Sequence, residues 1–292
     1  MTSVVTAVFP VAGLGTRFLP FTKSVPKEMA PILNKPLIQY AVEEAVEAGC
    51  TKLVFVSSET KSSIMAHFEP NSELERELSA RGKTNLLGSV QNIVPDNVKC
   101  EFVIQKEQLG LGHAVLCAEK AVGTDPFCVI LPDDFITGAT ESATSQLVKA
   151  HQRGGLAQLS VMEVEPSQIS NYGVVKPGQG INQVERLIEK PEQSEAPSNI
   201  ASIRRYVFNT SIFAAIKNAG FGHGGEIQLA DAIDQLAQDG KVEMVTLNGK
   251  RFDCGSNRGY MNAVLHLADR RKNRSQSELY AANGKCRRTG SA

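Results

Sequence analysis

Residues 4–17 read Val4-Val-Thr-Ala-Val-Phe-Pro-Val-Ala-Gly-Leu-Gly-Thr-Arg17, an apolar run followed at once by a loop with two glycines. The run from Val4 to Val11 predicts a buried strand that stops before Gly13. In open α/β sheets, ligands bind beyond the carboxyl ends of the strands, and a glycine there lets the backbone approach a phosphate closely. The loop is therefore a candidate anion site, although a plain tight turn would explain the glycines equally well.

The rest of the first half alternates in the same way. We expect helices over 36–48, 60–81 and 113–121, and short buried strands over 53–56, 101–104 and 127–131. This alternation predicts a mostly parallel sheet with helices on both faces.

The second half is more mixed. It predicts strands over 158–164, 173–176, 184–188, 204–208 and 242–247, and helices over 210–217, over 226–238 and from the segment after 255 to about 271. Since neither a repeat nor a linker interrupts the chain, we expect one Rossmann-like α/β domain over residues 1–271 with a mixed, mostly parallel central sheet. The polar and basic residues 272–292 are expected to form a solvated, frayed tail.

Bulk composition narrows the class of protein. The 292 residues carry 31 basic and 31 acidic side chains, so no overall field favours nucleic acid or an anionic membrane. The longest apolar runs are too short to span a bilayer, and nothing near Met1 has the pattern of a signal peptide. We therefore expect a cytoplasmic protein without a membrane or nucleic-acid partner. The six cysteines lack metal-site spacing and are expected to be reduced thiols.

Two cations follow the glycine loop. Arg17 and Lys27 are separated by Pro20 and Pro26, which restrict the intervening backbone. Arg forks onto phosphate oxygens and Lys supplies a point charge, so the pair suits a polyphosphate; ordinary surface cations are the alternative. Phe18 stands where a dinucleotide-binding fingerprint needs its third glycine, which weakens a dehydrogenase interpretation.

Residues 10–29 resemble the signature of the sugar-nucleotide pyrophosphorylases. They read Pro10-Val-Ala-Gly-Leu-Gly-Thr-Arg-Phe-Leu-Pro-Phe-Thr-Lys-Ser-Val-Pro-Lys-Glu-Met29. Ala12-Gly13 and Pro26-Lys-Glu-Met29 are similar to the bacterial UTP–glucose-1-phosphate uridylyltransferases in particular. Further matches follow in order: Gly110-Leu-Gly-His-Ala114, Leu131-Pro-Asp-Asp134, Tyr172-Gly-Val-Val175, Glu189-Lys-Pro191, Gly225-Glu-Ile-Gln228 and Asp253-Cys-Gly255.

The resemblance implies a nucleotide-diphospho-sugar transferase fold, with a nucleotide-binding half over about 1–135 and a sugar-phosphate half over about 136–271. It implies a Mg²⁺-dependent transfer of UMP from UTP to glucose 1-phosphate, giving UDP-glucose and pyrophosphate, in a homo-oligomer (tetramer or dimer). The implied nucleotide-binding residues are Ala12, Gly13, Gly15, Gln105 and Gly110. The implied catalytic residues are Arg17, Lys27, Asp133 and Lys190; the metal ligands are Asp133 and Asp253. The implied sugar-phosphate residues are Gly173, Glu189, Lys190, Glu226 and Gln228, the last two at the start of a helix.

The chemistry agrees with these residue types. A phosphomonoester has a second pKa near ~6, so the attacking phosphate is already largely dianionic and needs no general base. The reaction needs cations and a metal around the phosphates. Removing the Asp133 charge should abolish most turnover and barely affect folding, because it relieves clustered negative charge. The sequence leaves two alternatives open. One is the same chemistry with another nucleotide, such as dTTP, or another sugar; the other is a non-catalytic regulatory relative that binds sugar nucleotides.

Overall fold

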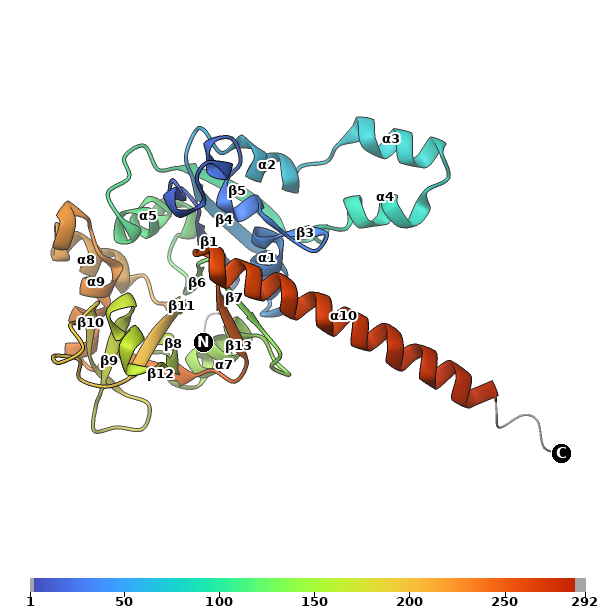
Figure 1. The fold of residues 1–292 in the computed structure, drawn as a ribbon. Helices are drawn as coiled ribbons and strands as arrows, with labels where there is room; N and C mark the ends of the chain where they lie inside the picture. The colour runs from blue at the N-terminus through green and yellow to red at the C-terminus, as the bar shows by residue number, and fades with distance from the viewer. Residues whose placement is uncertain (1–2, 287–292) are drawn as a thin grey trace.

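The structure, a computed structural model, describes residues 3–286 and the side chains of residues 3–222 and 224–272. Its centre is a nine-stranded sheet with the path β10-β9-β11-β6-β1-β4-β5, which β8 and β12 extend (Figure 1). The strands are β1 (Thr6–Pro10), β4 (Lys52–Ser57), β5 (Lys99–Ile104), β6 (Phe127–Ile130), β8 (Ala157–Glu163), β9 (Gly173–Pro177), β10 (Val184–Glu189), β11 (Ile200–Phe208) and β12 (Val242–Thr246).

Strand direction changes between the two halves of the chain. β1 runs parallel to β4 and β6, and β4 runs parallel to β5. β11 is antiparallel to β6, β8 and β9. The sheet is therefore mixed, with the all-parallel N-terminal half that the strand–helix alternation predicts, and the carboxyl ends of β1, β5 and β6 open on the same edge.

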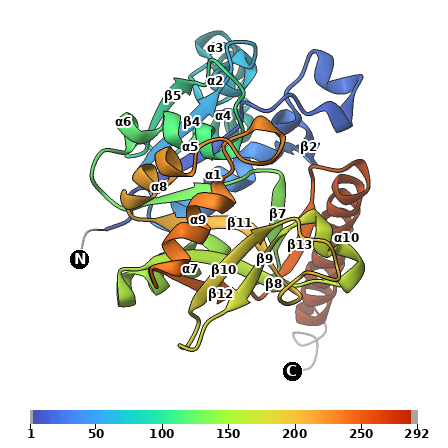
Figure 2. The same cartoon turned by 90° about the vertical axis from the view of Figure 1, so that its left-hand side faces the viewer.

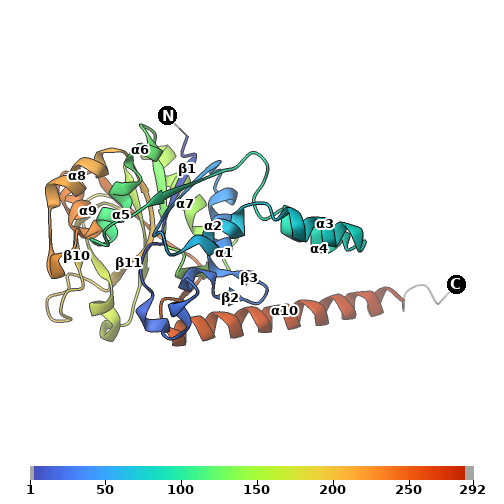
Figure 3. The same cartoon turned by 90° about the horizontal axis from the view of Figure 1, so that it is seen from above.

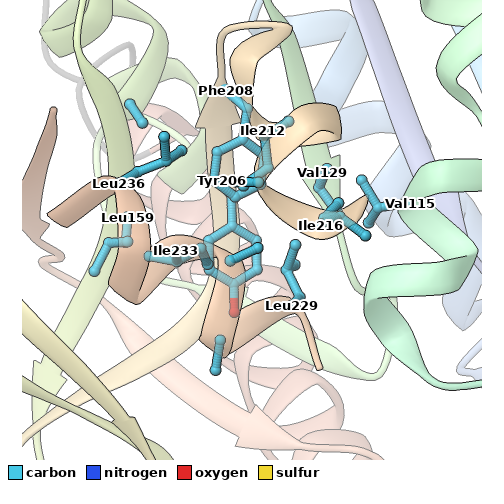
Figure 4. Packing of buried hydrophobic residues seen from close by; sticks show 14 of the residues in the cluster. Val115, Val129, Leu159, Tyr206, Phe208, Ile212, Ile216, Leu229, Ile233 and Leu236 are labelled. Atoms are coloured by element: carbon cyan, nitrogen blue, oxygen red, sulfur yellow. The ribbon is translucent and has the colours of Figure 1, made fainter. Parts of the chain in front are cut away.

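Both faces of the sheet are covered by helices, because alternate strand residues point to opposite sides. Val8 and Val129 belong to one core cluster, which α5 (Leu111–Cys117), α8 (Ser211–Ala219) and α9 (Leu229–Gln238) cover (Figures 2 and 4). Phe9 and Ile130 belong to the other cluster, beneath α1 (Leu37–Glu47) and α7 (Ala143–Gly154).

The helix predicted over 60–81 is wrong. The structure has α2 (Ser62–Phe68) and α3 (Ser72–Ala80), followed by an unpredicted α4 (Thr84–Gln91). Pro70 causes the break, because it has no N–H to donate and disfavours helical backbone in the residue before it. α3 and α4 form a hairpin that projects from the body of the protein (Figure 3).

Other boundaries also differ from the prediction. The helix predicted over 113–121 divides at Ala118 into α5 and α6 (Glu119–Val122), and the one predicted from 226 begins at Leu229. The last helix, α10 (Asn257–Cys286), continues well beyond residue 271 and leaves the body of the protein (Figures 1 and 3). Most of the predicted tail is therefore helical, and residues 287–292 lie outside the described residues.

The sequence prediction also missed α7 and the four strands of two small two-stranded sheets. β7 (Asp134–Thr137) pairs with β13 (Lys250–Asp253), and β2 (Pro31–Ile32) pairs with β3 (Lys35–Pro36). These strands are too short for a period-2 pattern to stand out. Within residues 3–286, no helix is both long and apolar enough to cross a bilayer.

Candidate active site

A cavity of about 460 Å³ lies at the carboxyl ends of β1, β5 and β6, and we call it the N-terminal cavity. It brings together all five predicted nucleotide-binding residues and three of the predicted catalytic residues. They are Ala12, Gly13, Gly15, Gln105, Gly110, Arg17, Lys27 and Asp133.

The glycine loop has one position that requires glycine. Gly15 has φ 65°, and a Cβ there would lie 3.1 Å from Cγ2 of Thr22. The Thr22 hydroxyl donates to the Gly15 carbonyl at 2.9 Å and holds the turn. Arg17 extends from the end of this turn, and its Nη1 donates to the carbonyl of Gly255 at 3.4 Å. The loop after β1 is thus joined to the loop after β13.

Lys27 and Asp133 form an ion pair inside the cavity, with 2.6 Å between Nζ and Oδ2. Burial alone would lower the pKa of Lys27, but the carboxylates of Asp133 and Glu28 outweigh burial and raise it. Burial likewise opposes ionisation of Asp133, yet Lys27 and Arg204 hold the pKa of its carboxyl well below the usual range. The expected cluster of uncompensated negative charge at Asp133 is therefore wrong, because cations from distant segments surround it.

The two adjacent carboxylates have different roles. Asp134 is fully buried; it forms an ion pair with Arg251, whose Nη1 also donates to the Tyr172 hydroxyl at 2.8 Å. Asp133 lines the N-terminal cavity, whereas Asp134 does not. Arg251 was missed because its strand, β13, was not predicted.

Arg205 fixes the backbone around Asp133. Its side chain is 2% exposed and forks onto Glu44, with Nη2 and Oε2 2.9 Å apart. It also donates to the carbonyls of Leu131 and Asp134, at 2.8 and 2.6 Å. A second buried pair, Glu28–Lys61, supports the glycine loop: Lys61 Nζ donates to Glu28 Oε2 at 2.9 Å and to the Val11 carbonyl at 2.6 Å.

Those two pairs carried no sequence signal, because their members lie far apart along the chain. Burial is the largest influence on Glu28 and Lys61; it raises the pKa of the Glu28 carboxyl and lowers the pKa of the Lys61 ammonium. The Arg205–Glu44 pair holds the segment around Asp133, and the Glu28–Lys61 pair holds the start of the glycine loop.

Gln105 is buried at the floor of the N-terminal cavity. Its Nε2 donates to the Gly110 carbonyl at 3.3 Å and contacts Nδ1 of His113 at 3.0 Å. Since an amide nitrogen can only donate, Nδ1 of His113 accepts. The side chain thus uses its donors internally, and no described residue donates to its Oε1, which remains an acceptor for a ligand.

Gly110 and Gly112 join the two halves of the protein. A Cβ on Gly110 would lie 2.8 Å from Cβ of Glu226, and one on Gly112 would lie 2.7 Å from the carbonyl oxygen of Ile227. The same oxygen accepts from the Gly112 amide at 2.8 Å, and the Ile227 amide donates to Leu109 at 2.7 Å. We call this contact between residues 109–112 and 226–228 the glycine clamp.

A second cavity, of about 200 Å³, lies beside the clamp, and we call it the C-terminal cavity. It gathers the predicted sugar-phosphate residues Gly173, Glu189, Lys190, Glu226 and Gln228. Gly173 faces Glu189 across the β9–β10 pair, and a Cβ on it would approach Oε2 of Glu189 to 3.1 Å. Glu226 and Gln228 precede α9 and do not lie within it as predicted; Gln228 is the residue before its first turn.

Two carboxylates from different halves meet at Gly255. A Cβ on this glycine would lie 3.0 Å from Oδ1 of Asp253 and 3.1 Å from Oδ2 of Asp133, so the two oxygens are at most the sum of these distances, about 6.1 Å, apart. No group of three or more acidic, His or Cys side chains in the described part of the chain could hold a metal alone. Two carboxylate donors fit Mg²⁺, which takes its other ligands from water and substrate phosphates.

Known proteins with similar sequences identify the family of this chain. A family model described as nucleotidyl transferase matches residues 7–270. The chain belongs to this nucleotidyl transferase family. It is 44% identical to a UTP–glucose-1-phosphate uridylyltransferase of Bacillus subtilis, over 89% of this chain and 88% of that protein. It is 42% identical to the enzyme of that name from Pseudomonas aeruginosa, over 88% of this chain and 93% of the relative.

Solved structures of nucleotidyltransferases have the same fold. UTP-bound UGPase from Acinetobacter baumannii superposes with a TM-score of 0.84 at 40% identity, covering 90% of this chain and 93% of its own. A UDP-glucose pyrophosphorylase complexed with UDP-glucose gives a TM-score of 0.83 at 36% identity, covering 91% and 99%. The predicted fold class and family are confirmed.

Proposed function

We propose that this nucleotidyltransferase transfers UMP from UTP to glucose 1-phosphate, forming UDP-glucose and pyrophosphate. The observation that carries the proposal is the arrangement of two cavities around one cationic junction. A third, small cavity of about 170 Å³ lies between the glycine loop and Gly255, and its walls include Arg17, Lys27 and Asp133. We call it the junction cavity. The names of the close relatives supply the choice of nucleotide and sugar.

UTP is assigned to the N-terminal cavity. The open Oε1 of Gln105 accepts from the N3–H of uracil, while Ala12, Gly13 and Gly110 lie along the base and ribose. Cytosine has no hydrogen on N3, so it would place two acceptors against each other. The triphosphate then follows the glycine loop toward Arg17 and Lys27.

Glucose 1-phosphate is assigned to the C-terminal cavity. Glu189 accepts from sugar hydroxyls, Gly173 leaves room for the sugar against the backbone, and Lys190 contacts the phosphate. Glu226 and Gln228 complete the wall. The side chain of Lys190 is 58% exposed, so it can reach an incoming anion from solvent.

The reaction forms a bond from a phosphate oxygen of glucose 1-phosphate to the α-phosphorus of UTP and breaks the bond from that phosphorus to the bridging oxygen of pyrophosphate. No proton needs to move, because the nucleophile is already dianionic near neutral pH. Arg17 and Lys27 neutralise the phosphates and stabilise the departing pyrophosphate.

Mg²⁺ is the metal we propose, with Asp133 and Asp253 as its protein ligands. When bound, it would neutralise charge on the nucleotide phosphates and so favour attack by an anion. The homo-oligomeric state and the cytoplasmic location stay predictions.

A pyrophosphate-release screen tests the proposal. The purified chain would be incubated with Mg²⁺, each of UTP, dTTP, CTP and ATP, and several sugar 1-phosphates. We expect release to be fastest with UTP and glucose 1-phosphate. Faster release with dTTP would favour the related thymidylyl specificity, and no release with any pair would favour a regulatory relative.

A further inference from the structure

β11 contains an irregularity beside the active site. Ser202 pairs with Val161 of β8 and Tyr206 pairs with Leu159, so three residues of β11 lie opposite the single residue Ser160. Such bulges occur next to active sites and redirect side chains. Here the bulge presents two consecutive arginines in different environments: Arg205 binds Glu44 on the buried side, whereas Arg204 lies at the cavities.

The backbone of Arg204 is strained. Its φ of 60° lies in the left-handed region, which residues other than glycine, asparagine and aspartate rarely adopt. Strained residues of this kind persist only where the surrounding structure imposes them, and they cluster at functional sites. The carbonyl of Arg204 accepts from the Leu131 amide at 3.3 Å, which links this strained residue to the segment that carries Asp133.

The guanidinium of Arg204 is held close to carboxylates but has unused donors. Its nitrogens lie 3.8 Å from Oδ1 of Asp133 and 3.8 Å from Oδ2 of Asp134, beyond hydrogen-bond distance. None of the hydrogen bonds found among the described residues uses an Arg204 side-chain donor. A charged group with five N–H donors and 28% exposure is therefore available to bind an anion.

Arg204 lies between the positions proposed for the two substrates. It lines the C-terminal cavity together with Glu189 and Lys190, and it lines the junction cavity together with Arg17 and Lys27. No other described residue lines both of these cavities. Arg204 is the residue that the two cavities share, and in the proposed function the phosphate of glucose 1-phosphate approaches the α-phosphate of the nucleotide beside it.

We propose that Arg204 is a further catalytic residue, whose guanidinium contacts the attacking phosphate of the sugar and the α-phosphate of UTP and holds them together while the new bond forms. The proposal rests on the proposed function. The two phosphates repel each other, and a fixed fork of donors between them reduces this repulsion most in the transition state. Arg204 therefore acts mainly on turnover, whereas Lys190 acts mainly on sugar-phosphate binding.

The test replaces Arg204 with Gly and, separately, with Gln. Gly removes the guanidinium and suits the positive φ, so Arg204→Gly should fold at least as well as other variants at this site. We expect kcat to fall ~10²–10³-fold in both variants, with the Kd for UTP measured by calorimetry changed only a few-fold. Added guanidinium ion, below unfolding concentrations, should restore part of kcat in Arg204→Gly and none in Arg204→Gln, whose side chain fills the space.

Leu33→Gly is the matched control, because Leu33 also has a positive φ of 59° but lines neither cavity. It should keep normal turnover. If Arg204→Gly and Arg204→Gln turn over within about threefold of the wild type, the catalytic role is wrong and the proposed function stands. A reduced kcat that accompanies a lowered melting temperature and that guanidinium does not restore would indicate a structural role instead. A wild-type chain without turnover would overturn the proposed function, and this proposal with it.

Discussion

Asp133→Asn tests the ion pair and the proposed chemistry together. The substitution keeps the size of the side chain and removes its charge, so Lys27 loses the partner that lies 2.6 Å from its ammonium. Removing one member of a buried pair costs ~3–5 kcal/mol, because the remaining charge stays buried without compensation. The side chain of Lys27 is still 20% exposed and lies near Glu28, so we expect the lower end, about 3 kcal/mol.

That loss corresponds to a fall of ~6–12 °C in Tm for a domain of this size class. Turnover should fall at least ~10²–10³-fold, since Asp133 is also the proposed metal ligand. From the sequence we expected Asp133→Asn to fold almost normally. Because the structure shows the ion pair with Lys27, we now expect this variant to be clearly less stable than the wild type.

The pH dependence supplies an independent check. The folded-state pKa of Asp133 is depressed, so its stabilisation is present above the unfolded-state pKa and is lost as the pH falls through the folded-state value. The pKa of Lys27 is raised, so its contribution persists to alkaline pH. The stability difference between wild type and Asp133→Asn should be constant at neutral pH and should shrink below about pH 4.

The assays are urea unfolding across pH and pyrophosphate release. Asp125→Asn, the same chemical change at an exposed position before β6, is the control and should alter neither quantity. An unchanged Tm would show that the Lys27–Asp133 pair contributes nothing to stability. Near-normal turnover at limiting Mg²⁺ would eliminate Asp133 as a metal ligand.

Three further predictions concern the rest of the site. Lys190→Ala should raise the KM for glucose 1-phosphate ~10-fold or more through loss of a charge-assisted contact, while calorimetry shows unchanged UTP affinity; the reverse pattern would reassign Lys190 to the nucleotide. Gln105→Ala should reduce the preference for UTP over CTP by ~0.5–1.5 kcal/mol in kcat/KM, and an unchanged preference would exclude it as the group that reads the base. Arg205→Met should lower the free energy of unfolding by ~3–5 kcal/mol, and Arg205→Met combined with Glu44→Leu should recover much of it; a double variant no more stable than the single one would refute the buried-pair explanation.

The sequence was sufficient to predict those residues of the site that belong to short, contiguous motifs. Gly15 and Asp133 follow β1 and β6, parallel strands whose carboxyl ends share an edge, and Lys27 and Glu189 belong to motifs that resemble those of the family. Those positions could therefore be assigned without coordinates, and the structure brings them into adjoining cavities.

The supporting residues could not be predicted in this way. Glu44, Lys61, Arg205 and Arg251 are isolated charges in helices, strands or turns, and their pairing depends on how segments more than thirty residues apart pack together. Arg204 adds a second obstacle: its side-chain direction follows from a bulge, and a bulge changes the strand period at one point without a compositional signal.

The glycine clamp has a consequence for how the protein folds. It joins residues 109–112 to residues 226–228, and the site also requires Gly15 near the beginning of the chain and Gly255 near its end. Contacts between such distant segments form slowly, because a long loop must close before they gain any energy. The cavities should consequently be completed only in the last steps of refolding. Recovered turnover would then report the fully folded chain, whereas helical circular dichroism would recover earlier, from locally formed elements such as α3 and α4.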